Sequence, residues 1–294
     1  MSWDLIALGE TMLTFTPAAG ASLRTCGEAA VDHAGAESNT CVGLARLGFR
    51  VAWVSRVGVD PAGDRIVDAI AAEGVDTRWV RRDLTRPTGL MLKERGRVRY
   101  YRTGSAASAM TAADLDEVPV RAARAVLVTG VTALIGPGPH DAGLALLARA
   151  AGTRIVDPNL RDGLWGSHRR AELVMPYVDR CDVLLAGTAE LCEILGASDD
   201  EGLARRAAGR GAGEIVVRGN DRVGALSEGV WQTIAINRGD AVDPIGAGDA
   251  FNAGYVATRL RGGSTEEALQ AGIRCGTAVT TAPSDTAAFP RSLS

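Results

Sequence analysis

The second half of the chain alternates short apolar segments with longer segments of helical periodicity. Residues 125–129, 154–156 and 183–185 are apolar, and a helical pattern follows each of them. Such helices return the chain to the same edge of a sheet, so that successive strands run parallel. The pattern predicts an α/β fold with a mostly parallel central sheet and helices on both faces. The helical segments are 140–150, 169–178 and 188–195.

The first half of the chain contains the same elements, interrupted by hairpin-like segments. Residues 12–16 and 23–31 are expected strands around a turn, and residues 89–93 and 97–102 form a second predicted hairpin. We interpret residues 1–294 as a single domain carrying a small β lid, built from about 11–31 and 88–103. A lid of this kind excludes water from a transfer reaction. The alternative is that these strands extend the edge of one sheet.

Length and composition limit the possible functions. A chain of 294 residues with 46% hydrophobic content can bury one large core. The net charge of -3 argues against nucleic acid or an anionic membrane as a partner. No apolar run approaches membrane-spanning length, and no basic flank precedes the first strand, so we expect a soluble, cytoplasmic protein. The five scattered cysteines suggest neither a disulfide framework nor a zinc site.

Two common nucleotide-binding loops are missing from the sequence. Lys93 is the only lysine, and Leu92 precedes it, so the chain has no Gly-Lys-Ser/Thr phosphate loop. The glycines of residues 209–213 lack the spacing of a dinucleotide fingerprint, and no helix follows them. A nucleoside triphosphate would therefore be bound by backbone amides and arginine.

Residues 242–252, Val-Asp-Pro-Ile-Gly-Ala-Gly-Asp-Ala-Phe-Asn, place small residues and an acid at the start of a predicted helix. Several N–H groups can then face one anion, and the helix dipole adds positive potential. Asp249 would lie beside that anion hole, where it could take a proton from a hydroxyl. Phosphoryl transfer to an alcohol needs this combination. The alternative is a tight turn followed by an ordinary acidic residue.

The segment 243–251 resembles the C-terminal signature of the ribokinase-like (PfkB) carbohydrate kinase family, and the resemblance covers nearly the whole chain. It implies a ribokinase-like three-layer sandwich and an ATP-dependent kinase that uses Mg²⁺. It further implies that Asp249 is the general base. The amides of Gly246, Ala247 and Gly248 would then hold the transferring phosphate.

Residues 35–40 resemble the N-terminal signature of the same family, although Ala34 replaces its first glycine. The resemblance implies that Gly35 and Asn39 contact sugar hydroxyls. A helix start with free amides suits a polyol or a carboxylate. A simple capped helix start is the alternative.

Residues 100–108 resemble the corresponding segment of 2-keto-3-deoxygluconate kinases, which implies that Tyr100 and Arg102 contact a sugar acid. Residues two apart on a strand share a face, and the arginine fork matches a carboxylate. A packed tyrosine with an exposed arginine is the alternative. Met91 stands where some of these enzymes carry a tyrosine, which leaves the particular sugar acid open.

Residues 156–161 follow a predicted strand, so Asn159 and Arg161 should lie at the carboxyl edge of the sheet, where ligands bind in α/β folds. The resemblance implies that Asn159 contacts ATP and that Arg161 meets both the substrate carboxylate and the ATP phosphates. An unpaired surface arginine is the alternative. Residues 187–190 resemble the family's Asn-x-x-Glu segment, with Gly187 where asparagine is common, and the resemblance implies that Glu190 holds Mg²⁺ through water. The same glutamate could simply stabilise a helix N-terminus.

Three further segments complete the expected site. Arg218, Gly219 and Gly224 resemble the segment along the ATP sugar and phosphates, with a longer intervening loop than usual. Residues 283–286 resemble a loop whose acid, here Asp285, faces a substrate hydroxyl. An ordinary polar turn is the alternative there.

These features predict an ATP-dependent kinase that converts a keto-sugar acid, 2-keto-3-deoxygluconate, to its 6-phosphate. The alternatives are a kinase of a neutral sugar such as fructose or ribose, and a non-catalytic sugar-acid sensor. The sequence leaves open whether a monovalent cation is needed. Exposed strand edges in the lid favour a homodimer or a higher homo-oligomer.

Overall fold

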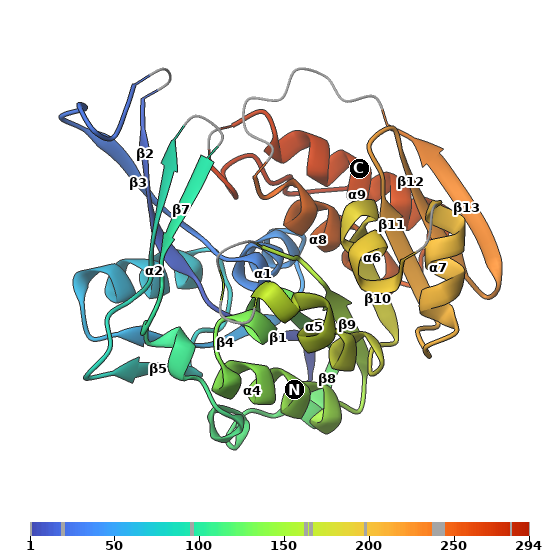
Figure 1. Cartoon of the computed structure of the whole chain (residues 1–294), viewed down its shortest axis with the longest axis horizontal. Helices are drawn as coiled ribbons and strands as arrows, with labels where there is room; N and C mark the ends of the chain where they lie inside the picture. The colour runs from blue at the N-terminus through green and yellow to red at the C-terminus, as the bar shows by residue number, and fades with distance from the viewer. Residues whose placement is uncertain are drawn as a thin grey trace.

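The computed structural model of the chain describes residues 2–18, 21–94, 97–161, 164, 167–196, 199–236, 245–282 and 284–293. Within these ranges the strands form one large and one small sheet, and Figure 1 shows the small sheet projecting at the upper left. No helix in the described ranges has the length and apolar character needed to cross a bilayer. Short 3-10 helices join some elements: η1 (Ala107–Ala109), η2 (Ala112–Leu115), η3 (Val120–Ala122) and η4 (Ser167–Arg169).

The large sheet has nine described strands in the order β13-β12-β11-β10-β9-β8-β1-β4-β5. All neighbours from β11 to β5 run parallel, whereas β12 and β13 are antiparallel. The predicted mostly parallel sheet is therefore confirmed. Its strands are β1 (Trp3–Leu8), β4 (Val51–Gly58), β5 (Val80–Asp83), β8 (Ala123–Thr129), β9 (Thr153–Asp157), β10 (Val183–Gly187), β11 (Glu214–Arg218), β12 (Arg222–Ser227) and β13 (Val230–Ala235).

Helices cover both faces of this sheet because successive side chains of a strand point to opposite faces. In β1, Leu5 and Ala7 belong to one buried cluster with α1, α2, α8 and α9, and Ile6 and Leu8 belong to the other with α3 to α7. The result is the expected three-layer sandwich (Figure 1). The helices are α1 (Ala36–Arg46), α2 (Pro61–Ala72), α3 (Gly130–Leu134), α4 (Pro137–Arg149), α5 (Arg170–Val178), α6 (Thr188–Leu195), α7 (Asp200–Ala208), α8 (Ala247–Leu260) and α9 (Thr265–Val279).

The small sheet has the order β3-β2-β6-β7. Its strands are β2 (Met12–Pro17), β3 (Ala29–Ala34), β6 (Leu90–Glu94) and β7 (Arg97–Tyr101). The predicted strand at 23–31 is wrong in position, because β3 pairs with β2 from Met12↔Ala34 to Pro17↔Ala29 and cannot extend beyond its partner. The turn between β6 and β7, residues 95–96, lies outside the described residues.

Some elements were not expected from the sequence. The edge strands β5 and β13 carry mostly exposed or half-buried residues, so they lack the apolar run that marks a buried strand. Helix α2 begins at Pro61, since Asp60 caps it by accepting from the N–H of Gly63 at 2.7 Å and Pro61 starts the first turn.

Candidate active site

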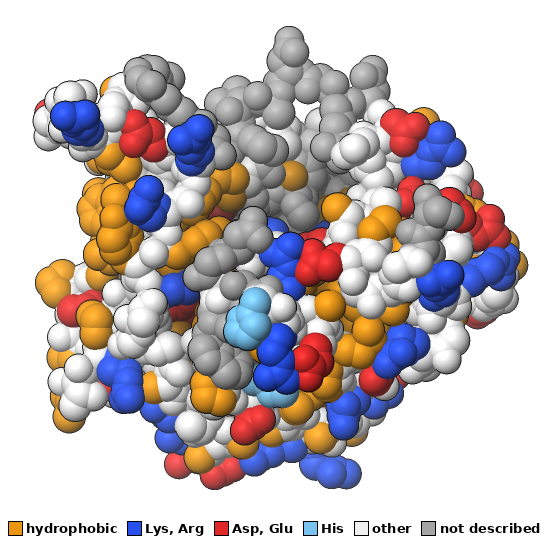
Figure 2. Space-filling model, viewed as in Figure 1, with side chains coloured by type: hydrophobic (Ala, Val, Ile, Leu, Met, Phe, Trp, Pro, Cys, Tyr) orange, Lys and Arg blue, Asp and Glu red, His pale blue; other side chains and the backbone are white. Residues whose placement is uncertain are grey.

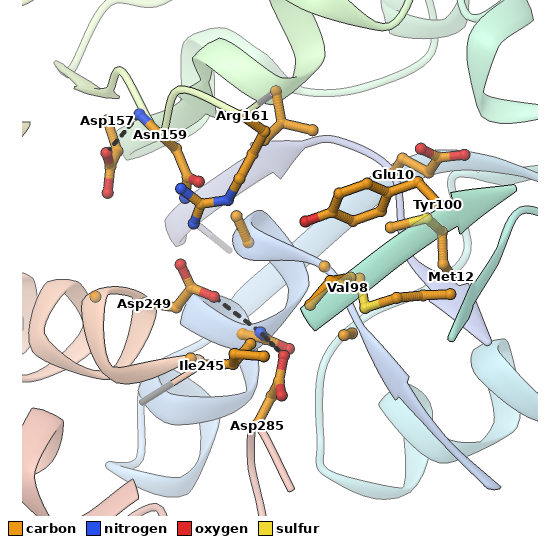
Figure 3. A pocket seen from close by; sticks show the side chains of 18 of the residues that line it. Glu10, Met12, Val98, Tyr100, Asp157, Asn159, Arg161, Ile245, Asp249 and Asp285 are labelled. Atoms are coloured by element: carbon orange, nitrogen blue, oxygen red, sulfur yellow. Dashed lines mark hydrogen bonds between the residues drawn. The ribbon is translucent and has the colours of Figure 1, made fainter. Parts of the chain in front are cut away.

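A cavity of about 380 Å³ lies where the small sheet faces the carboxyl ends of the parallel strands and the start of α8 (Figure 3). Segments from the whole length of the chain meet there, as the sequence predicted. The predicted residues that line this cavity are Gly35, Asn39, Tyr100, Arg102, Asn159, Arg161, Glu190, Arg218, Gly246, Gly248, Asp249 and Asp285.

The first turn of α8 lies at the cavity, where the sequence predicts an anion hole. Gly246 caps the helix in the left-handed conformation, φ 84°, and a Cβ on it would lie 3.0 Å from the Asp285 carbonyl oxygen. Only glycine fits both conditions. Among the described residues, no acceptor takes the N–H groups of Ala247 and Gly248. These amides are therefore free for an anion. The preceding Val242, Asp243 and Pro244 lie outside the described residues.

Asp249 sits in the first turn of α8 with its carboxylate toward the cavity (Figure 3). Burial, the largest cause, raises the pKa of Asp249 from 3.8 to about 7. The negative charges of Asp157 and Asp285 add to this rise, while the hydrogen bond from Asn39 and the charge of Arg161 oppose it. A carboxylate with a pKa near neutrality is suited to accept a proton from a hydroxyl.

Asn39 connects two acids of the site. Its Nδ2 donates to Asp249 Oδ2 at 2.8 Å and to Asp285 Oδ2 at 3.4 Å. The residue reaches this position because α1 begins at Gly35, where a Cβ would lie 2.4 Å from the Glu10 carbonyl oxygen. No side chain caps this helix start, so its first turn contributes to the cavity instead of to a cap.

Asp285 lines the cavity and contacts the small sheet. Only 3% of Asp285 is exposed, and its Oδ1 forms an ion pair with Nζ of Lys93, which is 5% exposed. The sequence reasoning noted Lys93 only as the single lysine and gave it no role in the site. Pro283, in the same predicted loop, lies outside the described residues.

Arg102 and Tyr100 face the cavity together, as their spacing predicted. The Arg102 guanidinium carbon lies 4.9 Å from the centre of the Tyr100 ring. Its Nε is 2.8 Å from Glu10 Oε2, an ion pair that the sequence reasoning missed. Nη1 of Arg102 is buried, and none of the described residues gives it a hydrogen-bond partner. A signal existed for Glu10, since this acid comes soon after β1 at the carboxyl edge of the sheet.

Met91 lines the cavity with 6% of its surface exposed. Met12 and Val98 stand beside it in the small sheet, and the three side chains make an apolar patch (Figure 3). The departure noted in the sequence therefore falls inside the cavity.

Arg161 extends over the cavity between Asp249 and Tyr100 (Figure 3). Among the described residues, its guanidinium hydrogen bonds only to the adjoining Leu160 carbonyl, at 3.0 Å. Asn159 holds the turn before it with a positive φ of 37°, and its N–H donates to Asp157 at 3.0 Å. A strained non-glycine residue is common at functional sites. The arginine thus remains available to an anionic ligand.

Glu190 is both a helix cap and a cavity residue. Its oxygens accept the N–H groups of Leu160 at 2.9 Å and Gly187 at 2.7 Å. Burial and the neighbouring Asp157 raise the pKa of Glu190, while Arg218 opposes the rise. A nearby cation would favour its charged form. No group of three or more metal-ligating acids, histidines or cysteines occurs in the described ranges, so these carboxylates fit a hydrated Mg²⁺ better than a protein cage.

Arg218 lines the cavity and is bound by the protein at the start of α8. Its Nη2 pairs with Asp157 Oδ2 at 2.9 Å, and its Nη1 donates to Asn252 at 2.7 Å and to the Gly248 carbonyl at 3.2 Å. Burial disfavours the charged form, but Asp157 and Glu190 outweigh it, so the pKa of Arg218 is raised. This arginine fixes the position of the α8 start.

A second cavity of about 380 Å³ adjoins the first and shares Glu190, Arg218 and Gly248 with it. The predicted residues Gly219 and Ala247 line this second cavity. Gly224, in β12, does not line it, because it packs against the ring of Trp231 in β13. One wall of this second cavity, between the sheet and α9, is mainly apolar and was not expected from the sequence. It consists of Val223, Ile236, Phe251, Ile273, Thr277 and Thr280.

The comparison of sequences identifies the family to which the chain belongs. Residues 3–291 match the family described as pfkB family carbohydrate kinase, so the chain belongs to this family.

Individual relatives indicate which kinds of carbohydrate kinase the chain resembles. The chain is 33% identical to a 2-dehydro-3-deoxygluconokinase of Bacillus subtilis, covering 99% of this chain and 93% of the relative. It is 31% identical to a 2-dehydro-3-deoxygalactonokinase of Haloferax volcanii, covering 92% and 89%. The fold also resembles the crystal structure of a Vibrio cholerae fructokinase bound to fructose, ADP and calcium, with a TM-score of 0.88, 22% identity, and coverage of 99% and 97%. The chain is therefore an ATP-dependent sugar kinase whose relatives include sugar-acid kinases.

Proposed function

We propose that this kinase transfers the γ-phosphate of ATP to the terminal hydroxyl of 2-keto-3-deoxygluconate, giving the 6-phosphate. The supporting observation is the pairing of Asp249 with the unoccupied amides of Ala247 and Gly248 in one cavity. Kinases that act on this sugar acid are among its relatives.

Asp249 removes or orients the hydroxyl proton as the sugar oxygen attacks the γ-phosphorus. The amides of Gly246, Ala247 and Gly248 stabilise the charge that grows on the phosphoryl oxygens. Donors placed in this way typically lower a barrier by about 3–4 kcal/mol each. Asn39 holds the carboxylate of Asp249 in place from the far side.

The carboxylate of the substrate would bind between Arg102 and Arg161, with Tyr100 against the sugar. Nη1 of Arg102 is buried without a partner among the described residues, a state that a bound carboxylate relieves. Gly35, Asn39 and Asp285 lie where sugar hydroxyls would reach. Arg161 also stands close enough to Asp249 to meet the phosphates (Figure 3).

The second cavity would hold the nucleotide, with Gly219 along its ribose and phosphates and Asn159 at the junction of the two cavities. Mg²⁺ neutralises charge on the phosphates when bound. Glu190 and Asp157 already accept hydrogen bonds from the protein, so each has only some lone pairs left. These two carboxylates would therefore bind the water ligands of Mg²⁺ rather than the ion directly. We expect the enzyme to work in the cytoplasm, the compartment that supplies ATP.

The small sheet would act as a lid over the sugar, within a single kinase domain of residues 1–294. Its outer face carries the exposed side chain of Tyr101 beside Leu92, and Figure 2 shows hydrophobic side chains gathered over this sheet. We propose that two copies pair through this face. A monomer in analytical ultracentrifugation at micromolar concentration would exclude such a dimer.

One observation favours a neutral sugar as the alternative substrate: Glu10 already neutralises Arg102. The deciding experiment measures ADP release with Mg²⁺-ATP and a panel of sugars. The proposal predicts turnover of 2-keto-3-deoxygluconate and its galacto isomer well above that of fructose or ribose. Faster turnover of a neutral sugar would replace the substrate assignment. Thermal stabilisation by the acid with no ADP from any sugar would indicate a sensor. Repeating the assay with Na⁺ or K⁺ salts tests for a monovalent cation.

A further inference from the structure

The single lysine of the chain is buried in the small sheet next to the sugar cavity. Lys93 lies on β6 and is 5% exposed, whereas many of the arginines are at the surface. A lysine is almost never buried unless it is paired, because removing its charge from water is unfavourable. The position of Lys93 therefore depends on a compensating acid.

That acid is Asp285, from the loop after α9. Its Oδ1 pairs with Nζ of Lys93, and its Oδ2 accepts from Asn39 Nδ2 at 3.4 Å. The same Asn39 nitrogen donates to Asp249 at 2.8 Å. A continuous chain of one ion pair and two hydrogen bonds thus runs from the small sheet to the base, through Lys93, Asp285, Asn39 and Asp249. We refer to these four residues as the carboxylate relay.

Only part of the carboxylate relay can touch a sugar. Asp285, Asn39 and Asp249 line the cavity, whereas Lys93 does not and stands behind Asp285. A ligand in the cavity would therefore experience Lys93 through the position and charge of Asp285. The lysine balances one of two carboxylates that share a single amide donor.

We propose that Lys93 is a positioning residue, which holds the Asp285 carboxylate toward a substrate hydroxyl and so makes sugar affinity depend on the small sheet. The inference rests on the proposed function of the cavity as a sugar site. Without the lysine, the buried Asp285 loses an ion-pair partner while the charge of Asp249 stays close, so we expect its carboxylate to move away from the substrate hydroxyl.

A double-mutant cycle tests this role, using Lys93→Met, Asp285→Asn and the double variant. We expect each single variant to raise KM for the sugar about tenfold or more, with KM for ATP changed less than about twofold. The double variant should be no worse than the single ones, since both changes interrupt the same contact. Lys93→Arg, which keeps the charge, should retain most of the sugar affinity. Arg99→Met is the matched control, because Arg99 is an exposed cation of β7 in the same sheet.

Three results would overturn the inference: an unchanged sugar KM in Lys93→Met, single-variant losses that multiply in the double variant, or equal losses for sugar and ATP. Circular dichroism of each variant identifies any that fail to fold. If Lys93→Met fails to fold, Lys93→Gln takes its place in the cycle, with the same criteria.

Because Lys93 is the single lysine of the sequence, its role can also be tested without measuring turnover. Protein labelled with ¹³C at lysine Cε gives one lysine signal. The sugar should shift this signal in the wild type, and ADP alone should leave it in place. A response to ADP but not to sugar would contradict the inference. Turnover of the wild type is measured first, and the series uses the sugar that it phosphorylates, so a different substrate would defeat the proposed function without deciding the role of Lys93.

Discussion

Replacing Asp249 by asparagine should abolish turnover and, at the same time, stabilise the folded protein at alkaline pH. The pKa of Asp249 is about 7 in the folded chain, against an ordinary value of 3.8, chiefly because the carboxylate is buried. A folded-state pKa raised above the unfolded one means that the folded state holds its proton over a wider pH range. Ionising this group therefore weakens folding as pH rises from about 4 to about 7. Above that range the loss is complete and constant.

The magnitude follows from the two pKa values. The difference between 3.8 and about 7 corresponds to about 4 kcal/mol of lost stability in the wild type at pH 8. Asparagine has no charge to lose, and its amide oxygen can still accept the hydrogen bond from Asn39. The advantage of the variant over the wild type should thus grow from near zero at pH 4 to at most about 4 kcal/mol at pH 8. Turnover should fall by a factor of about 10²–10⁴, the usual contribution of a general base.

Urea unfolding of both proteins at several pH values between 4 and 8 measures the stability difference, and ADP release measures turnover. Asp68→Asn, at an exposed position of α2, is the matched control and should show no such pH-dependent gain. Binding of the sugar acid by calorimetry should change little in Asp249→Asn. A variant that is no more stable than the wild type at pH 8 would show that the carboxylate is not held in a desolvated site. Near-normal turnover would remove Asp249 from the role of base.

Three further outcomes follow from the site. Because Asp249 must be ionised to accept a proton, kcat/KM of the wild type should rise as pH increases through about 7 and then level off; a profile flat from pH 5 to 8 would contradict this. Arg102→Ala should lower kcat/KM for the sugar acid about 10–100-fold and that for a neutral sugar far less, and equal losses in the ADP assay would refute carboxylate binding. Gly246→Ala should lower stability by about 1–3 kcal/mol in urea and reduce kcat, because the residue has φ 84° beside Asp285; Gly262→Ala, with φ 83° and open space around it, should lose stability but keep kcat.

The sequence predicted those parts of the fold and the site that local patterns determine. Buried parallel strands and their helices have strong periodicity, so the central sheet was expected, while the half-exposed edge strands β5 and β13 have none. Asn159 and Arg161 follow a strand, and Asp249 lies in the first turn of a helix. The structure brings all three to one cavity.

Other site features depend on contacts between distant segments and carry no local signal. The ion pair of Glu10 with Arg102 joins residues 92 positions apart, and Lys93 meets Asp285 across 192 positions. The apolar wall of the second cavity consists of residues such as Ile236 and Ile273, which are indistinguishable from core residues in the sequence. Gly224 is a further example, since it packs against the Trp231 ring of the neighbouring strand and does not line the second cavity.

The most direct test of the account is the position of the phosphate on the product. Phosphorus NMR of wild-type enzyme incubated with Mg²⁺-ATP and 2-keto-3-deoxygluconate, correlated with the sugar protons, identifies the carbon that receives the phosphoryl group. The account predicts one phosphomonoester coupled to the two protons of C6, formed in step with ADP. Phosphate attached to another carbon, or ATP converted only to ADP and inorganic phosphate, would contradict it.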